Sequence, residues 1–116
     1  MERQALDRWG HGDPSGFLEI SDPEIVYFDP FIEKRIDGIT ALTAYYQPLR
    51  GQIHIDQDEI LYPKVQIAGE ACVLTFNYQS RSGTQSMAWN CTEVYRKSSA
   101  GWRIIQTHWS PTKPSQ

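Results

Sequence analysis

The chain has 116 residues, of which 40% are hydrophobic and 12% aromatic, and its formal net charge is −3. This length suits a single domain with a buried core. The absence of a basic cluster predicts no nucleic-acid partner. No apolar run approaches the ~20 residues of a membrane span, and no charged-then-apolar leader opens the sequence. We therefore expect no membrane segment and a cytoplasmic location.

Metal or disulfide chemistry is not expected either. The two cysteines, Cys72 and Cys91, are too few for a disulfide framework or a zinc site. The histidines do not have the spacing of metal ligands to one another. No Ser/His/Asp nucleophile motif and no phosphate-binding glycine loop is visible. We predict a protein without a metal or other cofactor.

The first half of the chain predicts helices and a small hairpin. Apolar residues at helical spacing predict helices over 2–10, 14–20 and 39–47. Asp13-Pro14 supplies an N-cap and a first helical residue for the second of these. A strand is expected over 24–29, followed by a short strand near 32–36.

The second half predicts long strands separated by turns. Their expected ranges are 53–67, 71–80, 85–97 and 102–110, with turns at 68–70, 81–83 and 98–101. Pro63 lies inside the first range and predicts an edge position or a bulge. Helices followed by an antiparallel meander predict an α+β fold, in which a cone-shaped, curved antiparallel sheet wraps around the N-terminal helices and encloses a pocket. The domain is expected over 1–110, with a flexible tail over 111–116.

Both faces of the sheet carry aromatic residues, which predicts that both are covered. Successive side chains in a strand point to opposite faces. In the last strand, Trp102 and His108 then lie on one face and Trp109 on the other. Helices cover one face, and we expect a homodimer through the other. The residues assigned to this outer face are Phe76, Tyr78, Asn90, Thr92, Gln106 and His108.

Several segments, in their order and spacing, resemble one family. They are Trp9 with Gly12-Asp13, Val26-Tyr27-Phe28-Asp29-Pro30-Phe31, Gly38-Ile39-Thr40-Ala41-Leu42, Gly101-Trp102-Arg103-Ile104 and His108-Trp109-Ser110. Together they resemble the nuclear transport factor 2-like superfamily, and the SnoaL-like and ketosteroid-isomerase-like members are the most similar. The resemblance spans nearly the whole chain. It implies the cone fold, which hosts isomerases, dehydratases, epoxide hydrolases, polyketide cyclases and non-catalytic association domains.

The resemblance also implies roles for individual residues. Asp29 falls where ketosteroid isomerases carry the proton-abstracting carboxylate, and Glu93 falls on the protonated acid of their oxyanion hole. Trp109 falls on the tryptophan of their pocket. Their oxyanion tyrosine falls on Ala5, so that donor is missing, and Tyr27 or Tyr46 is the candidate replacement.

The superfamily includes the association domain of calcium/calmodulin-dependent protein kinases, whose pocket is lined by arginines. The equivalent positions are Asn77, Glu93 and Trp109. None is basic, so an anionic ligand bound in that way is not expected.

Each candidate acid also has a structural interpretation. Asp29 next to Pro30 could accept backbone N–H bonds in a turn. If it lies at the mouth of a pocket, it could act as a base. Glu93 could form a cross-strand ion pair with Arg103. If an apolar pocket keeps it neutral, it could donate a hydrogen bond to an oxyanion.

The aromatic residues predict a pocket for a small apolar or aromatic ligand. The expected ligand-binding residues are Trp9, Tyr27, Tyr46, Asn77, Trp89 and Trp109. Two functions stay open: a cofactor-independent acid/base enzyme of the isomerase, cyclase or dehydratase type, and a non-catalytic ligand-binding or association module.

Overall fold

A computed structural model describes residues 1–113, which form three α-helices and a six-stranded sheet. The elements in chain order are α1 (Glu2–Gly10), α2 (Ser15–Glu19), β1 (Ser21–Phe28), β2 (Ile36–Asp37), α3 (Ile39–Tyr46), the 3₁₀ turn η1 (Gln47–Leu49), β3 (Gln57–Ala68), β4 (Ala71–Ser82), β5 (Gln85–Ser98) and β6 (Gly101–Pro111). The predicted helices and long strands are all present, so the expected α+β fold class is confirmed.

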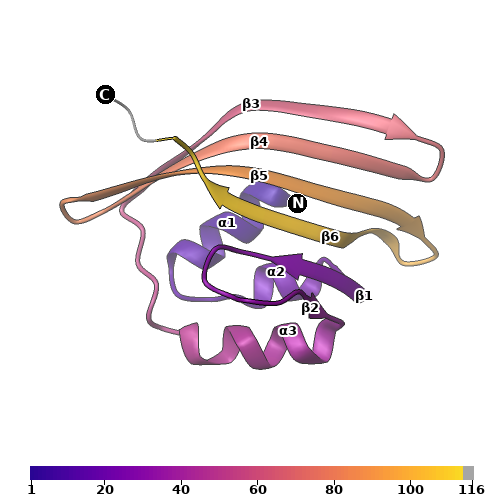
Figure 1. The fold of residues 1–116 in the computed structure, drawn as a ribbon, viewed down its shortest axis with the longest axis horizontal. Helices are drawn as coiled ribbons and strands as arrows, with labels where there is room; N and C mark the ends of the chain where they lie inside the picture. Colours follow the sequence, from indigo (N-terminus) through magenta and orange to yellow (C-terminus); the bar gives the residue numbers. More distant parts are fainter. Residues whose placement is uncertain (114–116) are drawn as a thin grey trace.

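The helices gather on one side of a curved sheet (Figure 1). The strand order is β2-β1-β6-β5-β4-β3, and the sheet does not close. The expectation that the sheet is antiparallel throughout is wrong at one pair, since β1 runs parallel to β6. The chain passes from β1 to β6 through α3 and the whole meander, and such a long connection permits parallel pairing.

The loop after α1 fixes how the first two helices meet. Gly12 adopts a positive φ of 82° and donates its N–H to the carbonyl of Trp9 at 2.9 Å. Glycine is favoured there because it carries no Cβ to clash in this conformation. Asp13 then accepts the N–H of Ser15 at 3.0 Å, which satisfies one free donor of α2.

The core lies between the helices and the inner face of the sheet. Leu6, Ile25, Leu42 and Ile104 are each only 1–2% exposed. Burying a side chain of this size stabilises the fold by about 1.5–3 kcal/mol. These four residues come from α1, β1, α3 and β6, so the core ties both halves of the chain together.

The edge strand β3 contains the irregularity that Pro63 predicted. Its pairing with β4 shifts between Leu61 and Lys64, and Tyr62 has a positive φ of 54°. β3 lies at one end of the strand order. A proline can occupy such a place because it interrupts no central hydrogen-bond ladder.

Strand register corrects the predicted outer face. Phe76 pairs with Cys91, and Tyr78 pairs with Trp89. Phe76 and Tyr78 are 4% and 3% exposed and belong to the core, so their assignment to the outer face was wrong. The other residues assigned to that face are exposed: Asn90, Thr92, Gln106 and His108.

Among the described residues, no helix has the length and apolar character that crossing a membrane requires.

Candidate functional site

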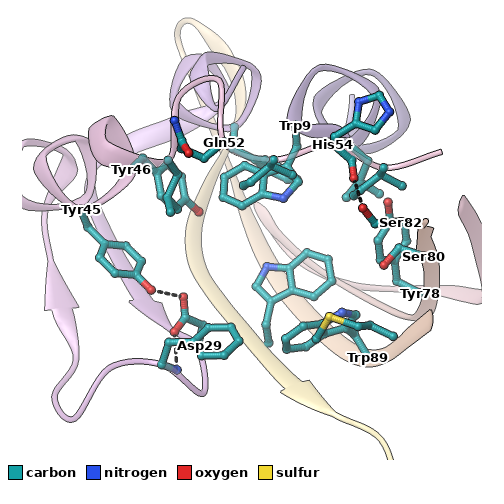
Figure 2. Close-up of a pocket in the computed structure, with 18 of the residues that line it drawn as sticks. Trp9, Asp29, Tyr45, Tyr46, Gln52, His54, Tyr78, Ser80, Ser82 and Trp89 are labelled. Atoms are coloured by element: carbon teal, nitrogen blue, oxygen red, sulfur yellow. Dashed lines mark hydrogen bonds between the residues drawn. The ribbon is translucent and has the colours of Figure 1, made fainter. Parts of the chain in front are cut away.

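A cavity of about 470 Å³ lies between the helices and the inner face of the sheet (Figure 2). Most of its wall is aromatic or aliphatic. The apolar and aromatic residues are Leu6, Trp9, Phe17, Tyr27, Phe31, Tyr45, Tyr46, Leu49, Ile53, Ile55, Tyr78, Met87, Trp89 and Trp109. The other lining residues are Asp29, Gln52, His54, Ser80, Ser82 and Gln85. This combination of an apolar wall and few polar groups is typical of small-molecule sites.

Asp29 lies just after β1 and is partly exposed to the cavity. Its Oδ2 accepts hydrogen bonds from the hydroxyls of Tyr27 at 2.9 Å and Tyr45 at 2.7 Å. Its Oδ1 accepts the backbone N–H of Phe31 at 2.8 Å. All three partners are donors, so the arrangement suits an ionised carboxylate. The predicted turn bond is therefore present, and the same side chain also faces the cavity.

The tyrosines around Asp29 form a connected group. The ring of Tyr46 packs against that of Tyr27, with centroids 5.6 Å apart, and Tyr27 donates to Asp29. Burial, reinforced by the nearby carboxylate, raises the pKa of both Tyr27 and Tyr45. These phenols therefore stay protonated at neutral pH and act as hydrogen-bond donors.

Polar groups also gather at the other side of the cavity. Figure 2 shows His54, Ser80 and Ser82 across from Asp29 and Tyr45, with Trp9 and Trp89 between them. The hydroxyl of Ser82 donates to the carbonyl of His54 at 2.6 Å. These groups come from the loop before β3 and from the end of β4.

Asp56 fixes the loop on this side. Its carboxylate accepts the N–H of Gly83 at 2.7 Å and lies 2.8 Å from Nε2 of His54. The bond from Gly83 is the main reason that the pKa of Asp56 is lowered, and His54 contributes less. The loop before β3 is thus tied to the turn between β4 and β5.

Glu93 is completely buried and belongs to a cluster of polar side chains on the inner face of the sheet. Cys91 donates to its Oε1 at 3.6 Å, and the hydroxyl of Tyr95 lies 3.3 Å from its Oε2. That hydroxyl is closer to Glu2, at 2.9 Å from Oε2. A carboxylate oxygen of Glu93 and one of Glu2 lie within 4.8 Å of each other, and the buried Oε1 of Glu2 has no hydrogen-bond partner among the described residues. Two buried carboxyl groups at this separation disfavour the doubly ionised state.

Burial is the main reason that the pKa values of the groups in this cluster are raised. It holds the pKa of Glu93 well above its usual value, and the neighbouring Glu2 carboxyl raises it further. Burial also raises the pKa of Glu2. Cys91 is affected in the same way, so its thiol stays protonated. Glu93 is the more deeply buried of the two carboxyl groups, so we assign a proton to it.

Neither interpretation of Glu93 from the sequence matches this environment. The ion pair with Arg103 is wrong, because Arg103 donates to the carbonyl of Trp102 at 3.1 Å instead. Glu93 is also not among the residues that line the cavity. It is a neutral acid, as the resemblance implied, but it contacts Glu2 rather than open cavity space.

Asn77 does not share a face with Glu93 and Trp109, which corrects a second expectation. Asn77 pairs with Asn90 and donates to it at 2.8 Å, while Trp109 pairs with Cys91. Asn77 is not among the cavity-lining residues. The other predicted ligand-binding residues, and Asp29, all line the cavity: Trp9, Tyr27, Tyr46, Trp89 and Trp109.

Glu2, Cys91 and Glu93 bring together donor atoms of the kind that bind metals. One donor atom of each lies within 4.8 Å of the others. Burial and the Glu2 carboxyl raise the pKa of Glu93, and a proton on Glu93 would relieve the repulsion between the two carboxyl groups without an ion.

Three functional candidates were missed from the sequence. Tyr45 contacts Asp29, although its helical spacing in the sequence indicates only packing. His54 lines the cavity, although it lies in a polar segment whose sequence gives no signal of a site. Glu2 was overlooked because an acid in the first turn of a helix usually faces solvent.

The fold and the aromatic cavity define a protein of the nuclear transport factor 2-like class. Residues 2–113 match the model of the calcium/calmodulin dependent protein kinase II association domain. The chain belongs to this association-domain family, within the nuclear transport factor 2-like superfamily. Among curated proteins, none matches the sequence significantly.

Solved structures give the same class. A candidate ketosteroid isomerase from Parabacteroides distasonis is 42% identical, with a TM-score of 0.88; the match covers 97% of this chain and 83% of that one. A nuclear transport factor 2-like protein of unknown function from Pseudomonas putida is 24% identical, with a TM-score of 0.79 and coverages of 99% and 87%. The calcium/calmodulin-dependent kinase II hub of S. rosetta is 18% identical, with a TM-score of 0.75 and coverages of 96% and 91%. The last two similarities concern the fold alone.

Proposed function

We propose that this protein binds a small, flat, largely apolar molecule in its cavity, with Asp29 as the polar anchor. The observation that carries the proposal is a mainly aromatic cavity of about 470 Å³ with a carboxylate in its wall. The similarity to a candidate ketosteroid isomerase supports a small-molecule site on this fold.

The hydrogen bonds of Asp29 indicate what it can do for a ligand. An ionised carboxylate offers about four acceptor positions. Three of them are occupied by Tyr27, Tyr45 and the N–H of Phe31. The remaining position can accept one donor from the ligand, either as a fixed hydrogen bond or as a proton taken up in catalysis.

An acid/base reaction would need its second group from the cavity wall. Glu93 is not among the residues that line the cavity, so this geometry does not support the predicted Asp29–Glu93 pair. Tyr45 is the phenol closest to Asp29, at 2.7 Å, and could return a proton. Binding is therefore the primary proposal, and turnover would be an addition to it.

The test is calorimetric titration with tryptophol, a neutral, flat probe. We expect binding to the native protein and weaker binding to Trp89→Ala, which removes part of the cavity wall. Trp102→Ala is the matched control, because Trp102 packs against the core but does not line the cavity. Equal loss in both variants, or no binding to the native protein, would contradict the proposal.

Self-association is the second candidate function, and membership of an association-domain family favours it. The structure adds that Asn90, Thr92, Gln106 and His108 are exposed on the outer sheet face. No helix among the described residues covers this face, since the helices lie on the other side (Figure 1). We propose that two copies meet there.

Sedimentation velocity tests this second proposal. Thr92→Arg places a charge in the centre of the outer face and should shift the protein from dimer to monomer. Thr40→Arg adds the same charge on an exposed position of α3 and should leave the mass unchanged. A monomeric native protein at micromolar concentration would refute the outer-face dimer.

A further inference from the structure

We infer that the natural ligand is an aromatic or otherwise flat amine, bound as a cation with its ammonium group at Asp29. This inference rests on the proposed small-molecule function and specifies the chemical class of the ligand. The argument uses the charge of the cavity, the aromatic groups near Asp29 and the neutral polar groups across from it.

The first observation is an uncompensated charge. Asp29 is the one carboxylate among the lining residues, and within residues 1–113 the lining contains no lysine or arginine. Arginines of the adjacent segments have other partners: Arg35 binds Asp37 at 2.6 Å, and Arg50 binds Asp13 at 3.1 Å. A ligand cation would supply the missing opposite charge.

The hydrogen bonds at Asp29 keep this charge in place. Tyr27, Tyr45 and the backbone N–H of Phe31 all donate to the carboxylate. They orient the carboxylate but bring no positive charge to it. The one remaining acceptor position matches an ammonium N–H, and a hydrogen bond between two ionised groups is stronger than a neutral one.

The second observation is the aromatic surrounding of this carboxylate. Tyr27 and Tyr45 both bind Asp29, and their ring centroids lie 6.0 Å apart. Phe31 follows Asp29 closely in the chain, and its ring lies 6.1 Å from that of Trp89. Aromatic rings attract ammonium groups through the negative charge of their faces. A carboxylate among aromatic side chains therefore favours a cation over a neutral or anionic group.

The third observation concerns the rest of the ligand. Across the cavity lie the neutral side chains of Ser80 and Ser82, and Gln52 and Gln85 add two neutral amides elsewhere in the lining. His54 lies there too, but it is paired with Asp56. Nothing in that wall offers a fixed positive charge to a carboxylate or phosphate. The ligand body is thus expected to be flat and apolar, with at most a neutral polar group at its far end.

Three molecules of similar shape and different charge test the inference: tryptamine, tryptophol and indoleacetate. At pH 7 these carry a positive charge, no charge and a negative charge, respectively. Calorimetric titration of the native protein should give an affinity for tryptamine about tenfold or more above that for tryptophol. Indoleacetate should bind most weakly, because its carboxylate meets Asp29.

Substitution of Asp29 assigns the preference to this residue. In Asp29→Asn, the ratio of tryptamine affinity to tryptophol affinity should fall to about twofold or less. Asp37→Asn is the control, since Asp37 is exposed and lies outside the cavity lining. Should Asp29→Asn fail to fold, salt titration of the native protein replaces it. Raising the salt from about 0.05 M to about 0.5 M should weaken tryptamine binding but not tryptophol binding.

The outcomes separate this inference from the proposed function. If tryptophol binds as tightly as tryptamine, or if the preference survives Asp29→Asn or high salt, the amine inference is overturned and the binding cavity stands. If none of the three molecules binds the native protein, both the inference and the proposed function are overturned.

Discussion

Replacing Glu93 with glutamine should make the stability of this protein less dependent on pH. Glu93 is fully buried beside Glu2, and burial raises its pKa. Glutamine has nearly the same shape as a protonated glutamic acid and can still donate a hydrogen bond. The substitution therefore removes one titrating group while preserving the contacts of the cluster.

The magnitude follows from proton linkage. Burial raises the pKa of Glu93 in the folded state above the value of about 4.3 expected for an unfolded chain. The folded protein then holds a proton that the unfolded chain has released. Stability from this group is fully present below about pH 4 and falls by about 1.4 kcal/mol per pH unit as the pH rises toward the folded pKa. Glu93→Gln should remove this slope, so the variant gains relative stability as the pH rises.

Urea unfolding at pH 5, 6, 7 and 8 measures the effect. The difference in unfolding free energy between Glu93→Gln and the native protein should grow by about 1.4 kcal/mol per unit until the folded pKa is reached. The series stops at pH 8 because the unfolded Cys91 thiol ionises above it. Exposed Glu33→Gln should run parallel to the native protein. If the unfolding free energies of Glu93→Gln and the native protein also changed in parallel with pH, a buried, protonated Glu93 would be refuted.

Three further substitutions test the fold and the cluster by urea unfolding. Leu42→Ala should lower the free energy of unfolding by about 2–5 kcal/mol, because Leu42 is 1% exposed and its truncation leaves a cavity in the core. A loss below about 1 kcal/mol would contradict the close packing of Leu42. Gly12→Ala should lower the free energy of unfolding more than Gly69→Ala does. Both glycines have a positive φ, but only a Cβ at Gly12 would lie 2.9 Å from Gly51. Equal losses would argue against that close approach. Tyr95→Phe should cost about 1–3 kcal/mol, since it removes a donor to the buried carboxyl pair, and a neutral result would show that this bond is not needed.

Much of the secondary structure could be read from local sequence patterns. Helical spacing identified α1, α2 and α3, and alternation with turn residues identified the four long strands. Pro63 identified the irregular edge strand. The Asp-Pro segment marked the carboxylate that lies in the cavity wall, and five of the six predicted ligand-binding residues line that cavity. These features depend on neighbouring residues in the chain, which is why the sequence reveals them.

Strand register was harder to predict because a single residue reverses a face. The turn is predicted over 81–83, but Ser82 pairs with Gln85, so the observed turn consists of Gly83 and Thr84. Even-numbered residues of β4 then share a face with odd-numbered residues of β5, which separates Asn77 from Glu93. A register shift between Val94 and Tyr95 also breaks strict alternation in β6.

The sequence by itself determined the helices and the strands, because these follow from side chains close together in the chain. Only the tertiary structure decided which polar groups meet. Glu2 and Tyr95 are 93 residues apart and bond only because α1 packs against β5. Tyr45 reaches Asp29 only because α3 lies against β1. Such contacts depend on how whole elements pack, and burial then sets which carboxyl keeps its proton and which keeps its charge.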